Sequence, residues 1–149
     1  MPQGGAAAWL ILDDSASRFE QLTALRKALT LLTGEQPREI VLAVFGDSRQ
    51  RAFAAELAVY VALLNSVALP SRKQKPKTVQ VKKIVVYGDQ SQDRHAQARA
   101  VAEGNGLARE LTMLPPNELT PTHYRARVKK LARAHGWNIA EYNFARLKK

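Results

Sequence analysis

The chain has 149 residues, of which 46% are hydrophobic and 24% charged, which is typical of one soluble globular domain and excludes a disordered or fibrous chain. The absence of cysteine excludes disulfides and thiolate metal sites, so a reducing, cytoplasmic compartment is expected. The net charge of +10 has two explanations, a nucleic-acid-binding surface or a fragment whose missing part carries the balancing acids.

The first predicted elements are a strand and a helix. Residues 6–12 are apolar, but they lack the basic leader of a signal peptide and are too few to span a bilayer. We therefore expect a buried strand over residues 9–12 and no interaction with a membrane. Ser17 and Glu20 have the spacing of a capping box, and Gly34 is expected to end the helix that follows. The apolar residues of this helix recur at helical spacing: Phe19, Leu22, Leu25, Leu29 and Leu32.

The middle of the chain predicts two more strands. Residues 40–45 form a continuous apolar run, the pattern of a strand covered on both faces, and residues 79–87 form another strand that ends at Gly88. The helix expected between them has one apolar stripe: Phe53, Leu57, Val61 and Leu64. Residues 70–78 predict an exposed basic loop. We favour a solvated connector over an anion-binding loop there, because phosphate cradles need glycine.

A long alanine-rich helix is predicted over residues 91–113. The residues expected on its inward face are Val101, Gly104, Ala108 and Leu111. Three strands that alternate with helices predict a largely parallel sheet with helices on both faces, which is a three-layer α/β/α fold.

Residues 114–117 end this alternating pattern, because their two prolines bar helical geometry and cannot donate backbone hydrogen bonds. Thr120 and Pro121 predict the start of another helix, which Gly136 should end. The apolar stripe of that helix is Tyr124, Val128, Leu131 and His135. A short strand is expected over residues 137–142.

Residues 144–147 then begin a helix at the end of the sequence. The predicted organisation is an amino-terminal domain over residues 1–113, a proline-rich linker over 114–121, and a helix-strand extension over 122–149.

Two motifs invite a ligand-binding interpretation. Asp13 and Asp14 follow the first predicted strand, at the edge where α/β folds bind ligands, but beside two serines they are better interpreted as turn and helix-start residues. Residues 104–106, Gly-Asn-Gly, follow no strand and have Arg109 where a dinucleotide loop needs its third glycine. Small residues there instead allow a helix to approach the sheet closely.

The histidines do not predict a metal site. His95, His123 and His135 are far apart in the sequence, and no HExxH or other closely spaced ligand cluster accompanies them. His135 has a structural explanation beside the negative end of a helix dipole. We therefore predict no catalytic, metal-binding or cofactor-binding residue in this chain.

Residues 108–121, with the sequence ARELTMLPPNELTP, resemble the segment that joins the two domains of leucyl (cytosol) aminopeptidases. That family has approximately A-R-D-L-x-N-x-P-x-N-x-L-T-P there, so the Pro-Pro-Asn and Leu-Thr-Pro groups stand in the same register. Two positions depart from the pattern, since Glu110 replaces the usual Asp and Met113 the usual Asn.

The resemblance implies a macro-domain-like α/β/α module in front of a dinuclear metal aminopeptidase domain, in an enzyme that removes amino-terminal residues from peptides. The family's motifs, a Lys followed by Gly-Val-x-Phe-Asp-Thr-Gly-Gly and an Asn-Thr-Asp-x-x-Gly-Arg segment, have no counterpart in this sequence. The resemblance also implies that residues 122–149 are the truncated start of the catalytic domain, and the two zinc or manganese ions are expected in the missing rest of that domain. The expected partners are that domain and further copies in a hexamer, and peptide substrate only for the full-length protein. The expected role of this chain is to support assembly and to limit access to the active sites.

The alternative is a free-standing basic α/β module that binds nucleic acid, or a nucleotide in a macro-type pocket. Any nucleic-acid binding is expected to be weak and sequence-blind, because few aromatic residues accompany the bases.

Overall fold

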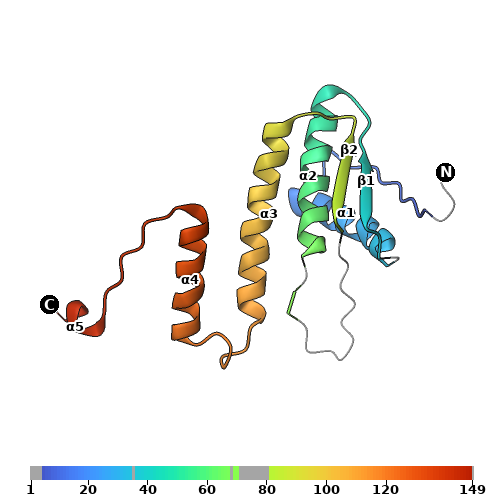
Figure 1. The fold of residues 1–149 in the computed structure, drawn as a ribbon. Coiled ribbons are helices and arrows are strands. Elements are labelled where there is room, and N and C mark those ends of the chain that lie inside the picture. Colours follow the sequence, from blue (N-terminus) through green and yellow to red (C-terminus); the bar gives the residue numbers. More distant parts are fainter. Residues whose placement is uncertain (1–4, 35, 68, 71–80, 149) are drawn as a thin grey trace. The chain divides into compact units, whose positions relative to one another are not determined.

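The structure is a computed structural model that describes residues 5–34, 36–67, 69–70 and 81–148. Most of the predicted basic loop, residues 71–78, lies outside the described residues. The chain divides into two compact units, Met1–Glu110 and Leu111–Lys149, which we call unit 1 and unit 2. The elements in chain order are α1 (Arg18–Thr33), β1 (Glu39–Ala43), α2 (Ser48–Ser66), β2 (Lys83–Tyr87), α3 (Gln92–Met113), α4 (Pro121–His135) and α5 (Phe144–Leu147) (Figure 1).

Unit 1 is a mixed α/β structure, as predicted. β1 and β2 pair in parallel, with Glu39 opposite Lys83 at one end and Ala43 opposite Tyr87 at the other. The first helix begins at the predicted capping box, in which the Ser17 backbone N–H donates to the Glu20 carboxylate and the Ser17 hydroxyl oxygen accepts from the Glu20 backbone N–H. These bonds satisfy backbone donors that a helix start leaves without partners.

The core of unit 1 lies between α1, α2 and one face of the sheet. Leu57 and Val59 of α2 have no exposed surface at all. The buried cluster contains Leu25, Leu29, Ile40, Leu57, Ala58, Val61 and Ala62. The predicted apolar stripe of α2 is therefore confirmed at Leu57 and Val61, and its Phe53 packs against the same cluster.

The prediction of a strand over residues 9–12 is wrong. These residues form no strand, and Trp9 and Ile11 are 84% and 94% exposed. The segment is held beside α1 instead, because Leu12 packs against the core cluster and the Asp13 carbonyl oxygen accepts a 2.9 Å hydrogen bond from Nε2 of the buried Gln21. The described sheet therefore has two strands rather than three.

In the described part of the chain, α1 and α2 cover one face of the sheet, and helices on both faces stay a prediction. Ile40 is buried in the cluster that α1 and α2 form with the sheet, and Leu42 packs against that cluster. Val41 and Tyr87, whose side chains point to the opposite face, are 52% and 61% exposed.

α3 confirms the predicted long helix but not its inward face. Its buried residues are Ala98, Ala102 and Gly106, whereas the predicted Val101, Gly104 and Ala108 are exposed. The predicted close approach of residues 104–106 to the sheet is not seen: an added Cβ at Gly106 would lie 3.2 Å from a methyl carbon of Val67, which follows α2, and one at Gly104 would meet no atom within 4 Å. Two further bonds join α3 to α2: Asn105 Nδ2 donates to Tyr60 Oη, and Arg109 Nη1 donates to the Leu64 carbonyl.

Unit 2 contains the predicted helix α4. The Thr120 hydroxyl accepts from the His123 backbone N–H, Pro121 occupies the first helical position, and Gly136 ends the helix with a left-handed φ of 67°. The strand predicted over residues 137–142 is wrong, since no described strand lies beside these residues to pair with them. They are joined to α4 through the side chain of Glu141 instead. None of the described helices has both the length and the apolar character needed to cross a bilayer.

Candidate functional site

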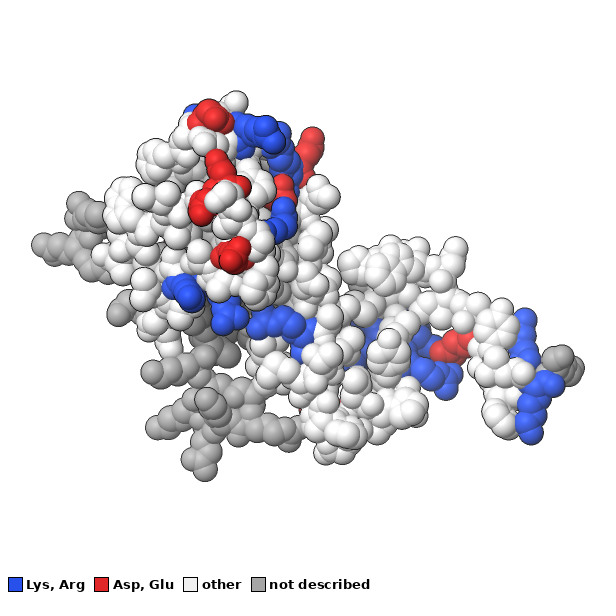
Figure 2. All heavy atoms as spheres, turned by 180° about the vertical axis from the view of Figure 1, so that it is seen from behind, with Lys and Arg blue, Asp and Glu red and all other residues white. Residues whose placement is uncertain are grey.

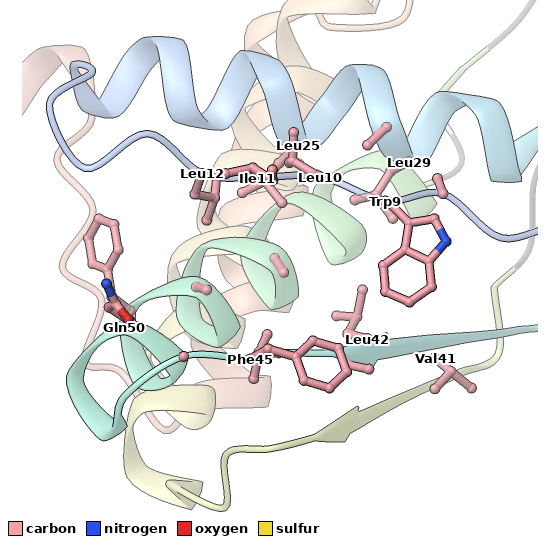
Figure 3. Close-up of a pocket in the computed structure, with 18 of the residues that line it drawn as sticks. Trp9, Leu10, Ile11, Leu12, Leu25, Leu29, Val41, Leu42, Phe45 and Gln50 are labelled. Atoms are coloured by element: carbon pink, nitrogen blue, oxygen red, sulfur yellow. The ribbon is translucent and has the colours of Figure 1, made fainter.

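A cleft of about 520 Å³ lies in unit 1 between residues 8–12 and the stretch from β1 to Gly46. Figure 3 shows the two segments running in the same direction on either side of it, with side chains from both facing the gap. α1 contributes Leu25 and Leu29, and α2 contributes residues from Gln50 to Ala58. The volume is within the usual range of small-molecule and peptide pockets.

The lining of the cleft is almost entirely apolar. Among the described residues that line it, Asp14 is the one charged side chain and Gln50 the one polar side chain. Phe45 is 73% exposed beside it, and Trp9 is more exposed still. Isolated exposed apolar residues are ordinary, but a concave group of them is a feature of binding sites. The described residues of the lining include no histidine, serine or cysteine, and their predominantly apolar surface suits an apolar group.

Asp13 and Asp14 lie at the carboxyl end of the first apolar segment, as predicted, and they have the predicted turn geometry. Asp13 Oδ1 accepts from the backbone N–H of Ser15 at 2.8 Å and from its hydroxyl at 2.6 Å. These two bonds lower the pKa of Asp13, because they stabilise its charged form. Asp14 Oδ2 accepts a longer bond, 3.4 Å, from Nε2 of Gln50.

The sequence did not predict a partly buried histidine–carboxylate pair that follows β2. Nε2 of His95 lies 3.2 Å from Oδ2 of Asp89, without the angle of a hydrogen bond, and the two side chains are only 16% and 14% exposed. The available sequence signal was Asp89, an acid just after a strand and near the start of α3. The Ser91 backbone N–H donates to Asp89 Oδ2 at 3.4 Å and its carbonyl oxygen accepts from the His95 backbone N–H, so these contacts join the loop after β2 to the first turn of α3.

The other histidines lie at opposite ends of α4. His123 is in its first turn, and the His135 ring stacks on Trp137 with a centroid distance of 4.9 Å and an angle of 20°. Across the described ranges, no group of three or more His, Asp or Glu residues could hold a metal ion. Residues 104–106 lie inside α3 and do not follow a strand, so they do not form a dinucleotide-binding loop.

Glu141 joins the extended segment of unit 2 to α4. Its Oε2 lies 2.9 Å from Nη2 of Arg125 and 3.0 Å from Nζ of Lys129. The hydrogen bond from Arg125 and then that from Lys129 lower the pKa of Glu141 from 4.5 to about 2. The carboxylate therefore helps to fix residues 137–143 against the helix.

Replacing Glu141 with glutamine is expected to loosen residues 137–143. Because the folded pKa is lowered, this contribution to stability is fully present above about pH 4.5 and is lost as the pH falls through about 2. Chymotryptic cleavage after Trp137 or Tyr142 at neutral pH should be faster in the variant. The difference should shrink at high salt, since the pair is solvent-exposed. Glu103→Gln in α3 is the control, and equal cleavage of both variants would contradict the prediction.

Comparison with models of known protein families and with curated proteins finds no match for this chain.

Proposed function

We propose that this chain is the non-catalytic amino-terminal part of a leucyl-aminopeptidase-type enzyme, with the first elements of its catalytic domain. The observation that carries the proposal is where the resembling residues 108–121 lie. They begin in the last turns of α3, span the change from unit 1 to unit 2, and end at the first residue of α4. A segment that joins two domains in the family is thus similar to a segment that joins two compact units here.

The proposal includes a macro-domain-like sheet with three layers in unit 1. The parallel β1–β2 pair and the helices α1 and α2 on one of its faces support this part of the proposal. The exposed face with Val41 and Tyr87 is where the third layer would pack.

The exposed apolar residues of unit 2 also support the proposal. Trp137 is 60% exposed, Ile139 41% and Phe144 72%. Burying a large apolar side chain contributes roughly 1.5–3 kcal/mol, so such residues are expected to contact further protein. The rest of a catalytic domain would cover them.

The chemistry belongs to that further domain. Two divalent ions, zinc or manganese, would activate a water molecule and polarise the peptide carbonyl there. The described residues of this chain offer no ligand cluster for these ions. Its own contribution would be to pack on the catalytic domain, to support a cytoplasmic homo-oligomer and to limit the access of peptides.

The test is to extend the chain along its own gene. We expect the reading frame to continue past Lys149 into the Lys-, Asp- and Glu-containing metal motifs, and the longer protein to hydrolyse leucine p-nitroanilide when manganese or zinc is added. The 149-residue chain should show no metal-dependent turnover above a heat-killed control, because it lacks these motifs. Turnover by the short chain would contradict the proposal.

A reading frame that stops at Lys149 would favour the second candidate, a free-standing basic module that binds nucleic acid. Residues 111–149 contain eight Lys or Arg and two Glu, and Figure 2 shows basic side chains on this carboxy-terminal part. Arg146 lies 4.7 Å from the centre of the Tyr142 ring and Lys148 4.6 Å from that of Phe144. Proteins bind single-stranded nucleic acids through basic side chains, which contact the phosphates, and aromatic rings, which stack on the bases.

A further inference from the structure

One edge of β1 is open, and the ladder with β2 identifies the backbone groups on it. The Val44 backbone N–H donates to the Tyr87 carbonyl, so the even-numbered residues of this stretch direct their backbone groups to β2. Because successive residues of a strand alternate, Glu39, Val41 and Ala43 of β1 direct theirs to the other edge. No described backbone group pairs with that edge.

Residues 8–12 form the opposite wall of the cleft. Backbone hydrogen bonds to β1 are absent from this segment in the described part of the chain. The packing of Leu12 and the bond from Gln21 to Asp13 hold the segment beside α1, and so keep the two walls apart. The space between them is bordered by two extended backbones and has apolar side chains from α1 and α2 along its length.

We propose that this cleft binds an extended peptide, which adds to the open edge of β1 as a strand. A purely apolar ligand would cover the side chains but leave the backbone N–H and C=O groups of β1 without partners, and that costs free energy. An extended peptide can do both: its backbone bonds to the open N–H and C=O groups of β1 and its side chains cover the apolar lining, as in other cases of strand addition. The strand with this open edge, Glu39–Ala43, has the length of an ordinary strand.

Two features of the site favour a peptide over other occupants. An added strand would continue the existing β1–β2 ladder. Asp14 is the one charge on the described lining, at the end of the cleft near Gly46 and Gln50. A peptide that runs antiparallel to β1 would bring its positive amino terminus to this carboxylate. The exposed position of Asp14 limits its contribution to affinity, so the ladder and the apolar lining supply most of it. This inference does not depend on the proposed aminopeptidase role.

The test uses the full chain with Trp137→Phe, which leaves Trp9 in the cleft as the one tryptophan. The probe is a short peptide of alternating valine and threonine with a free amino terminus and a carboxy-terminal dansyl group. We expect saturable energy transfer from Trp9 to the dansyl group. A control peptide with proline at alternate positions keeps the apolar character but cannot form the ladder, and it should bind at least about tenfold more weakly.

A matched pair of variants tests the edge of β1 itself. Ala43→Pro removes an N–H that faces the cleft, and proline is tolerated at such an open edge, so the far-UV circular dichroism should stay unchanged. Affinity for the peptide should fall about three- to tenfold, as for one lost hydrogen bond. Ala43→Val keeps the N–H and should bind within about twofold of the parent.

Three results would overturn the proposal. Equal binding of the alternating and the proline peptides would mean an apolar pocket without strand addition. Trp9 emission that is already that of a buried indole, and does not respond to peptide, would mean that residues 8–12 themselves close the cleft. A molecular mass that rises with protein concentration while the peptide fails to bind would mean that a second copy occupies it.

Discussion

Replacing Gly88 with alanine is expected to lower the free energy of unfolding of unit 1 by about 2–4 kcal/mol. Gly88 follows β2 and has a φ of 94°, a conformation that residues with a side chain rarely adopt. A methyl group there would also overlap the backbone carbonyl oxygen of Val44, at the end of the ladder with β1. That oxygen is a backbone atom and cannot move aside as the end of a flexible side chain could, so the strands would have to separate.

Gly104→Ala is the matched control for this prediction. Gly104 lies in α3, and an added Cβ would meet no atom within 4 Å. Alanine is the better helix former, so this variant should be more stable by about 0.5–1 kcal/mol. Urea denaturation followed by circular dichroism would measure both variants. A loss of stability in both, or in neither, would contradict the role assigned to the backbone at Gly88.

The helices were predictable because their signals are local. Ser17 and Glu20 fix a helix start through bonds between neighbours in the sequence, and so do Thr120 and His123. The same spacing exists at Asp47 and Gln50, which form the capping box of α2. Each of these sites forms without help from distant residues.

The strands were less predictable, because a strand needs a partner that sequence periodicity does not identify. Residues 9–12 and 137–142 have the apolar pattern of strands, yet each is held by side-chain contacts to a helix. The same limitation applies to the inward face of α3. Val101 is the more apolar residue, but the smaller Ala102 is buried because it permits the helices to come close.

The candidate site was not predictable from the sequence for a related reason. The cleft is formed by the separation of residues 8–12 from β1, two segments with a whole helix between them in the sequence. Composition identifies both segments as apolar, but it does not indicate that a gap lies between them. The Asp13 turn, in contrast, depends only on adjacent serines and was predicted correctly.

Leu57→Ala is expected to cost about 2–5 kcal/mol of unfolding free energy in unit 1. The Leu57 side chain has no exposed surface and belongs to the cluster in which α1, β1 and α2 meet. Removing its methyl groups loses their burial and leaves a cavity that close-packed neighbours fill only in part. Since small domains are stable by only about 5–15 kcal/mol, this loss should shift the urea midpoint clearly.

Leu31→Ala provides the control for the same chemical change, because Leu31 lies on α1 and is 72% exposed. It should change stability by less than about 0.5 kcal/mol. The ratio between the two variants tests whether the cluster around Leu57 is the main source of stability in unit 1. If both cost the same, α1 and α2 would not be held by this cluster. The lining that the two helices give to the cleft would then lack the rigid support that strand addition needs.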